Sequence, residues 1–302
     1  LSLFDFMIFY ITVLYNIMKN NKWLILCLFG MILLMSCRQK MYEPEFGVCS
    51  KIAGFPMLSA AGFDFVEEGV SRFLVPDKPD SIFLGILEEQ RKTGARVVSC
   101  NGFFPGHLKI VGDTTMHEEL LAWGEIALRR AQMAGMSYIV LGSGKARNVP
   151  EGFSKEDATG QFVDLCKKLG PIAREHHIII VIEPLNSGET NLINTVAEGA
   201  GIVEAVDHPN IQLLCDLYHM MRENEPAEHI VTYGKYIRHC HIAEKEGRTA
   251  PGVDQDDFTP YFAALKKIDY KGGVSIECRW KNLEEQAPSA LAYMKQQFES
   301  LK

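Results

Sequence analysis

Three carboxylates and one histidine each end a short apolar run in the second half of the chain. The runs cover Ile178–Glu183, Ile211–Asp216, Tyr236–His241 and Gly273–Glu277. Each has the length and composition of a buried strand, where a carboxylate or an imidazole costs free energy unless something binds it. One divalent cation would bind all of them, which predicts a metal site formed by Glu183, Asp216, His241 and Glu277.

Short apolar runs alternate with longer amphipathic segments along the chain. The predicted strands are Val48–Ala53, Phe63–Glu67, Arg96–Asn101, Ser137–Leu141, Ile178–Glu183, Ile211–Asp216, Tyr236–Ile242 and Gly273–Glu277. The predicted helices are Ser81–Thr93, Met116–Ala134, Lys155–Glu175, Thr195–Val206, Glu225–Tyr233, Tyr261–Lys267 and Leu283–Phe298. Pro56–Gly62 allows only a short helical turn. This alternation predicts one α/β domain with a parallel sheet and right-handed crossovers.

Eight strands of this kind close into a barrel more readily than they form an open sheet. Residues 48–302 have about the 250-residue length of a (β/α)₈ barrel. Ala53-Gly54-Phe55-Pro56, after the first strand, lacks the glycine-rich pattern of a dinucleotide-binding loop. Barrel enzymes carry their chemistry at the C-terminal ends of strands. The candidate ligands end strands five to eight, so they are expected to meet at one end of the barrel.

The composition is that of a globular protein, with 47% hydrophobic and 23% charged residues among 302. The net charge is −7 and no Lys/Arg run stands out, so a nucleic-acid partner is not expected. Cys215 and Cys240 each precede a candidate ligand, and side chains alternate along a strand, which points both thiols outward at the helices. We expect them to be small buried hydrophobic groups and expect no structural disulfide.

The first 36 residues are expected to lie outside the mature protein. Residues 1–17 precede Met18 and are interpreted as an over-extended reading frame, and Met18–Lys22 is basic. Trp23–Met35 is apolar but too short to span a bilayer as a mature helix. The following Ser36-Cys37 completes a signal peptide that resembles a bacterial lipoprotein lipobox. This predicts a lipid on Cys37, a tether over residues 37–47, and export to the periplasm or the outer membrane, with the lipid as the membrane contact.

Four motifs surround the candidate ligands in chain order. They read Glu183-Pro-Leu-Asn186 with Glu189, Asp216-Leu-Tyr-His219, His239-Cys-His241, and Ser275-Ile-Glu277-Cys-Arg279-Trp280. Together they resemble the xylose-isomerase-like TIM barrels, a family of sugar phosphate isomerases/epimerases that includes the ketose 3-epimerases. The resemblance covers the chain from about Val48 onward. It implies a single (β/α)₈ barrel that acts on a small carbohydrate.

The resemblance also implies roles for individual residues. Glu183, Asp216, His241 and Glu277 would hold one divalent ion, Mn²⁺ or Mg²⁺, with Co²⁺ or Zn²⁺ as alternatives. Glu183 and Glu277 would double as acid and base on opposite faces of the sugar, taking a proton beside a carbonyl and returning it through an enediolate. The substrate-binding residues would be Glu189, His219 and Arg248.

Other functions remain open at this stage. The same metal site would also suit a lyase or hydrolase that acts on 3-keto sugars or 3-keto glycosides. Export of the protein would favour such substrates over sugar phosphates, which are largely cytoplasmic. A sugar-binding protein without turnover is disfavoured because a pure binder needs no paired carboxylates on a metal. A repair nuclease of the endonuclease-IV type is disfavoured by the acidic charge and by the lack of extra histidines after strands two, three and seven. A homo-oligomer is compatible with the sequence.

Overall fold

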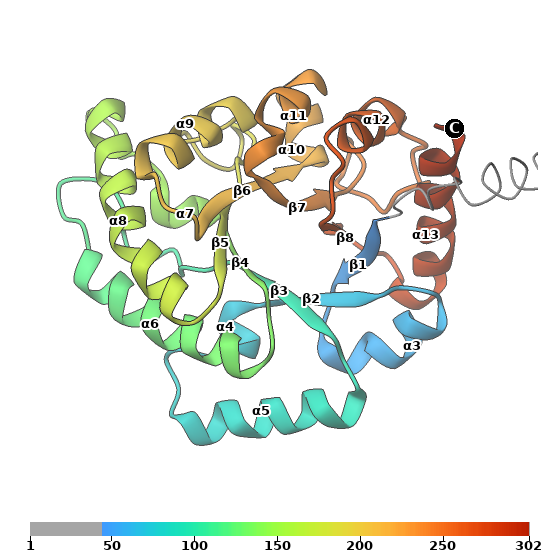
Figure 1. Cartoon of the computed structure of the whole chain (residues 1–302), viewed down its shortest axis with the longest axis horizontal. Coiled ribbons are helices and arrows are strands. Elements are labelled where there is room, and N and C mark those ends of the chain that lie inside the picture. Colours follow the sequence, from blue (N-terminus) through green and yellow to red (C-terminus); the bar gives the residue numbers. More distant parts are fainter. Residues whose placement is uncertain (1–43, 302) are drawn as a thin grey trace, which may run out of the picture. The chain divides into compact units, whose positions relative to one another are not determined.

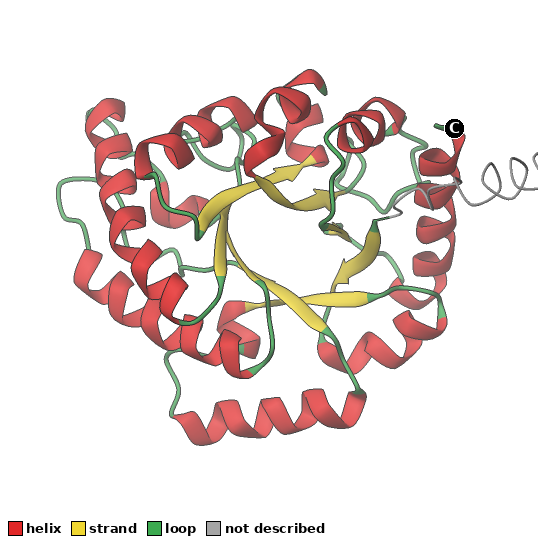
Figure 2. Cartoon of the chain, viewed as in Figure 1, coloured by secondary structure: helices red, strands yellow, loops and turns green. Residues whose placement is uncertain are grey.

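Eight parallel strands form a closed barrel in the order of the chain, β1 to β8, with β8 paired to β1. The computed structural model describes residues 44–301. Helices surround the ring of strands (Figures 1 and 2). The strands are β1 Glu45–Cys49, β2 Phe65–Gly69, β3 Val97–Asn101, β4 Tyr138–Leu141, β5 Ile179–Ile182, β6 Ile211–Asp216, β7 Ile237–Ile242 and β8 Gly273–Ile276. The predicted single (β/α)₈ barrel is therefore confirmed.

The helices form the outer layer of the barrel. They are α3 Phe55–Ala60, α4 Val70–Phe73, α5 Asp80–Thr93, α6 His117–Met133, α7 Gly144–Arg147, α8 Lys155–Glu175, α9 Val196–Val206, α10 Leu217–Arg222, α11 Glu228–Tyr233, α12 Thr259–Lys267 and α13 Leu283–Ser300, with 3₁₀ turns η1 Ile52–Gly54 and η2 Gly234–Tyr236. Within residues 44–301, no helix is long and apolar enough to cross a membrane. The candidate signal peptide and Cys37 lie outside the described residues.

The two faces of the strands form separate layers of side chains. The large hydrophobic core lies between strands and helices, and both Cys215 and Cys240 belong to it, as predicted. A much smaller apolar cluster, made of Val140, Val181 and Leu214, fills part of the barrel interior. All six cysteines of residues 44–301 are free thiols. Because so little of the interior is apolar, polar groups must occupy the rest of it.

The boundaries that differ most from the sequence-based expectation are those of the first strand and of the helix predicted at Glu225. The first strand is Glu45–Cys49 rather than Val48–Ala53, and Ile52–Gly54 turns into a 3₁₀ helix. The reason is a side chain: Glu68 Oε1 accepts the N–H of Ile52 at 2.9 Å, so that N–H is not available to a neighbouring strand.

The predicted helix Glu225–Tyr233 starts later, at Glu228, and a further short helix, α10, precedes it. Glu225 lies outside the helix because its carboxylate accepts the N–H of Val196 at 2.9 Å. Helix α10 follows β6 directly because Asp216, the last residue of that strand, also caps the helix. This arrangement brings His219 to the end of the barrel where β6 stops.

Candidate metal centre and active site

The four candidate ligands meet at the C-terminal end of the barrel. Each offers one ligand atom, and these atoms all lie within 4.8 Å of one another. Asp216 and His241 belong to β6 and β7, and Glu183 and Glu277 directly follow β5 and β8. The register pairs Asp216 with His241 across adjacent strands. The convergence follows from parallel strands ending at one rim.

Glu183 is held from both its backbone and its side chain. Its carbonyl oxygen accepts a hydrogen bond of 2.8 Å from the buried guanidinium of Arg147. Its carboxylate lies against Gly142, the residue after β4, where a Cβ atom would overlap Oε2. Burial raises the pKa of Glu183, helped by the charges of Glu277 and Asp216 and opposed by His241. Gly142 therefore creates the space that this carboxylate needs.

Asp216 turns one oxygen to the backbone and the other to the site. Oδ1 accepts the N–H of Tyr218 at 2.8 Å and that of His219 at 3.4 Å. Oδ2 is buried and has no hydrogen-bond partner among the described residues. Burial raises the pKa of Asp216 to about 6, although Arg248 and His241 oppose the shift. The nearest cation and donor, Arg248 Nη2 at 3.6 Å and His219 Nε2 at 3.5 Å, lie beyond ordinary hydrogen-bond distance, so a closer cation or donor would satisfy this oxygen.

His241 is the centre of the cluster and is fully buried. Its Nδ1 lies 2.9 Å from Glu183 Oε1 and 3.4 Å from Glu277 Oε2. Its Nε2 points the other way, toward Glu67. Burial alone would lower the pKa of His241, but the charges of Glu67 and Glu277 and the hydrogen bonds to Glu183 and Glu277 outweigh it and hold that pKa well above its usual value.

Glu277 carries the most firmly ionised carboxylate of the four ligands. Its Oε1 accepts a 2.7 Å hydrogen bond from the amide of Asn101, at the end of β3. Its Oε2 pairs with Arg248 Nη2. Burial would raise the pKa of Glu277, but His241 and Arg248 lower it to about 2. Asn101 thus orients one ligand from the opposite side of the barrel, a role the sequence did not reveal.

His219 presents a free N–H to the site. Its Nδ1 accepts the backbone N–H of Asn186 at 3.0 Å, so its one proton in the neutral form is on Nε2. That Nε2 is buried, has no hydrogen-bond partner within residues 44–301, and lies 3.5 Å from Asp216 Oδ2. Burial lowers the pKa of His219 to about 4, helped by Arg248 and opposed by Glu183. A neutral donor aimed at the ligands suits a substrate oxygen.

Glu189 and Arg248 form the outer edge of the site. Arg248 Nη1 lies 3.4 Å from Glu189 Oε1, and its guanidinium stacks 4.7 Å from the centre of the Tyr218 ring. Arg248 has a left-handed backbone, with φ of 53°. Non-glycine residues in that region store strain and are common at functional sites. Its Nε bond of 3.1 Å to the carbonyl of Glu277 ties this strained loop to a ligand.

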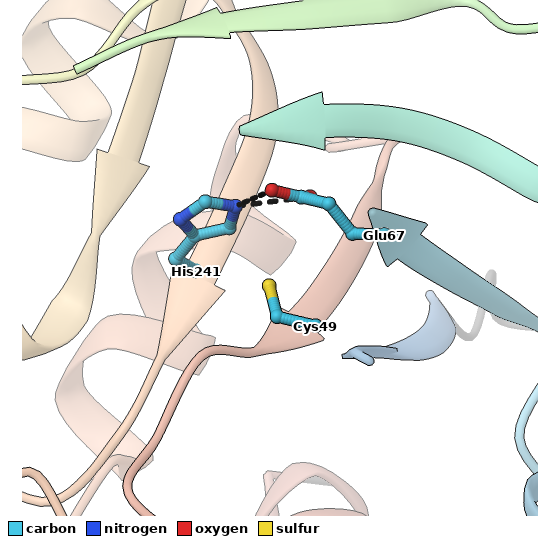
Figure 3. Close-up of side chains that lie close together, drawn as sticks. All are labelled: Cys49, Glu67 and His241. Atoms are coloured by element: carbon cyan, nitrogen blue, oxygen red, sulfur yellow. Dashed lines mark hydrogen bonds and ion pairs between the residues drawn. The ribbon is translucent and has the colours of Figure 1, made fainter. Parts of the chain in front are cut away.

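Two buried residues near His241, Glu67 and Ser99, were not recognised as site residues from the sequence. Glu67 on β2 accepts from Ser99 Oγ at 2.6 Å and contacts His239 Nε2 at 2.7 Å. It also lies 3.0 Å from His241 Nε2, and Figure 3 shows the two side chains facing each other beside Cys49. Burial would raise the pKa of Glu67, but the two histidines lower it far below its usual range. One sequence signal existed: two histidines two residues apart on one strand face need an acceptor.

The structure brings seven of the predicted site residues together. The candidate ligands form one cluster, and its immediate neighbours are Glu189, His219 and Arg248. Arg248 entered this set through the family resemblance, and the roles assigned to all seven residues stay predictions. Cys37, the candidate lipidation site, lies outside the described residues.

Known proteins resemble this chain in both sequence and fold. An L-ribulose 3-epimerase of Methylomonas sp. (strain DH-1) is 32% identical over 192 residues, which span 57% of this chain and 65% of that protein. A probable ketose 3-epimerase of Synechocystis sp. is 29% identical over 224 residues, which span 72% of this chain and 74% of that protein.

Among solved structures, D-psicose 3-epimerase from Clostridium cellulolyticum H10, crystallised with D-tagatose, superposes with a TM-score of 0.74 at 20% identity. The superposition covers 84% of this chain and 99% of that one. The family model described as "Xylose isomerase-like TIM barrel" matches residues 55–297. The chain therefore belongs to the xylose isomerase-like TIM barrel family.

Proposed function

We propose that this protein is a divalent-metal-dependent sugar isomerase or epimerase. The observation that carries the proposal is the cluster of Glu183, Asp216, His241 and Glu277, whose ligand atoms lie within 4.8 Å of one another at the catalytic rim of a barrel. Similarity to the two 3-epimerases supports the choice of sugar chemistry. Among the activities that such a rim supports, proton transfer beside a carbonyl uses both glutamates.

The residues present fit a hard divalent cation. Three carboxylates and one imidazole favour Mn²⁺ or Mg²⁺, with Co²⁺ or Zn²⁺ as alternatives. The buried Oδ2 of Asp216 lacks a hydrogen-bond partner in the described part of the chain, so it is available to bind a cation. When bound, the ion would stabilise negative charge that develops on the substrate oxygens.

The chain's own groups would perform the proton transfers. One glutamate, Glu183 or Glu277, takes the proton from the carbon beside the carbonyl, which leaves an enediolate, and the other returns a proton from the opposite face. The Nε2–H of His219 donates to a substrate oxygen. Arg248 donates a hydrogen bond to a second oxygen, and Glu189 accepts a hydrogen bond from a hydroxyl group at the outer edge. Together these contacts fix the sugar between the two glutamates.

Isotope exchange tests this mechanism directly. The protein from residue 38 onward, loaded with Mg²⁺ in D₂O, is incubated with a panel of ketoses and followed by NMR. We expect deuterium beside the carbonyl together with a new epimer or isomer. Glu183→Gln and Glu277→Gln should abolish both. Glu68→Gln, which changes an equally buried carboxylate outside the site, should retain them. Full activity in Glu183→Gln would refute the mechanism.

A second candidate, the cleavage of 3-keto glycosides, is favoured by one feature. A cavity of about 560 Å³ adjoins Glu189 and is lined by Lys109, Asp113, Lys145 and Asn148 among others. It offers space beyond a monosaccharide for a second sugar or an aglycone. The same NMR experiment with 3-keto glucosides separates the two functions, because release of the aglycone without an epimer would assign the lyase.

We also propose that the protein is exported and lipidated on Cys37, on the strength of the basic and apolar segments that precede this cysteine. Metabolic labelling with a fatty acid should mark the wild type and leave Cys37→Ala unlabelled. Equal labelling of both would refute this anchor.

A further inference from the structure

Glu67 occupies a position in the barrel that the proposed chemistry does not use. It lies on β2, its side chain is buried, and its carboxylate faces the Nε2 edge of the His241 ring (Figure 3). Its oxygens lie 3.0 and 3.1 Å from His241 Nε2. The metal-facing nitrogen, Nδ1, is on the other side of the same ring, 2.9 Å from Glu183 Oε1. One imidazole therefore joins Glu67 to the ligand cluster.

Three donors converge on this one carboxylate. Ser99 Oγ donates to Oε2 at 2.6 Å, and His239 Nε2 lies 2.7 Å from the same oxygen. The third is His241 Nε2. The ring of His239 is in turn stacked on Tyr138, with 5.6 Å between ring centres. A column of contacts thus runs through the barrel to the candidate ligands. Its members, in order, are Tyr138, His239, Glu67 and His241.

The contact with Glu67 determines which nitrogen of His241 can give up its proton and bind a cation. A carboxylate in this setting only accepts, so Nε2 of His241 carries a proton. In a singly protonated imidazole the other nitrogen, Nδ1, then presents its lone pair. That nitrogen faces Glu183 and Glu277. A ligating histidine whose other N–H is held by a carboxylate is fixed in both tautomer and ring orientation.

We propose that Glu67 is the positioning residue of the metal centre: it holds the Nε2–H of His241, so that Nδ1 is preset to bind the cation. Ser99 and His239 keep the carboxylate in place. The proposal rests on the proposed metal function and adds residues from β2 and β3 that contact no substrate.

The side chains in Figure 3 also fit a different arrangement, a second metal site of Cys49, Glu67 and His241, because their ligand atoms are mutually close. The contacts favour positioning instead. Three donors already reach Glu67 Oε2, and Cys49 Sγ lies 3.4 Å from the hydroxyl of Ser275. Glu67 Oε1 has no hydrogen-bond partner among the described residues, but it lies 3.0 Å from His241 Nε2, the nitrogen that positioning would hold. A metal there would also take the Nε2 nitrogen that faces Glu67. The two arrangements differ in metal stoichiometry, one ion against two.

Metal affinity of the protein from residue 38 onward tests the proposal without any substrate. Mn²⁺ binding is measured by calorimetry on the wild type, Glu67→Gln and Glu68→Gln, and bound metal is counted by elemental analysis. All three donors meet Glu67 at Oε2, and glutamine would place an NH₂ donor where Oε1 lies 3.0 Å from the Nε2–H of His241, so we expect Glu67→Gln to weaken Mn²⁺ binding about 10- to 100-fold. Glu68 is the neighbouring buried carboxylate, but it bonds to Ile52, Gly69 and Arg72 instead. Glu68→Gln should therefore bind Mn²⁺ like the wild type.

Two further measurements separate positioning from general destabilisation. Ser99→Ala removes one hydrogen bond to Glu67 without touching His241, and it should weaken Mn²⁺ binding in the same direction but less. In protein labelled with ¹⁵N-histidine and loaded with Zn²⁺, the wild type should show His241 protonated on Nε2 and metal-bound on Nδ1. Glu67→Gln should lose the downfield, strongly hydrogen-bonded Nε2–H resonance.

The outcomes are distinct. Wild-type affinity in a folded Glu67→Gln variant would overturn the positioning role. Two ions per chain in the wild type, falling to one in Cys49→Ser, would replace it with the second metal site. A wild type that binds no Mn²⁺ would refute the proposed metal function itself and, with it, this inference.

Discussion

Replacing Gly142 with alanine tests whether the position of the Glu183 carboxylate matters. Gly142 comes directly after β4, which pairs with β5, the strand that precedes Glu183. A Cβ added to Gly142 would stand 3.4 Å from Cδ of Glu183 and closer still to Oε2. The change adds one methyl group and alters no charge. Because the carbonyl of Glu183 is fixed by Arg147, the strain must fall on the carboxylate.

The size of the effect follows from that overlap. Relief of the contact requires the carboxylate to move by about 1 Å, and a displacement of this size in a reacting group costs about 10²-fold in rate. A hundredfold loss corresponds to about 3 kcal/mol. Overpacking should also lower the free energy of unfolding by about 1–3 kcal/mol. We therefore expect Gly142→Ala to lose about two orders of magnitude in kcat/KM and to bind Mn²⁺ more weakly.

The assay combines Mn²⁺ calorimetry, turnover and thermal unfolding, with Gly160→Ala as the matched control. Gly160 is an exposed residue of α8, and in the described structure no other side chain comes within 4 Å of a Cβ there. Gly160→Ala should keep full metal affinity and gain up to about 1 kcal/mol of stability from helix propensity. If Gly142→Ala matched Gly160→Ala in metal binding and turnover, the Glu183 carboxylate would not be where the reasoning needs it.

Three further predictions concern the substrate donor, the metal and a buried arginine. His219→Ala should lower kcat about 10²-fold with unchanged Mn²⁺ affinity, because its Nε2–H faces the site without being a ligand; a parallel loss of metal binding would contradict this. Removing metal with EDTA should lower the unfolding free energy by about 2.7 kcal/mol relative to protein at 100 times its Kd, and an unchanged Tm would count against a metal centre. Arg130→Ala should destabilise by about 3–5 kcal/mol, since Arg130 is 2% exposed and donates to Leu74, Val75 and Lys78 carbonyls and to Asp80. Arg129→Ala, which breaks an exposed pair with the same Asp80, should cost under about 1 kcal/mol; similar melting temperatures for both variants would refute the distinction.

The barrel and the convergence of Glu183, Asp216, His241 and Glu277 could both be predicted from the sequence. Apolar runs of strand length alternating with amphipathic helices leave few topologies, and parallel strands place their C-terminal ends at one rim. A ligand at the end of each of four successive strands therefore reaches the same point in space. The boundaries were less certain where a side chain competed for the backbone, as Glu68 does at Ile52.

The neighbours of those four side chains could not be predicted from the sequence. Glu67 meets His239 across 172 residues of sequence, and Asn101 meets Glu277 across 176. Such contacts depend on strand register, because a slip of one residue turns every side chain to the other face. The register shifts between Val66 and Glu67 on β2, at the residue that supports His241. No local pattern encodes that shift, so the closed barrel was needed to bring Glu67 into contact with His241.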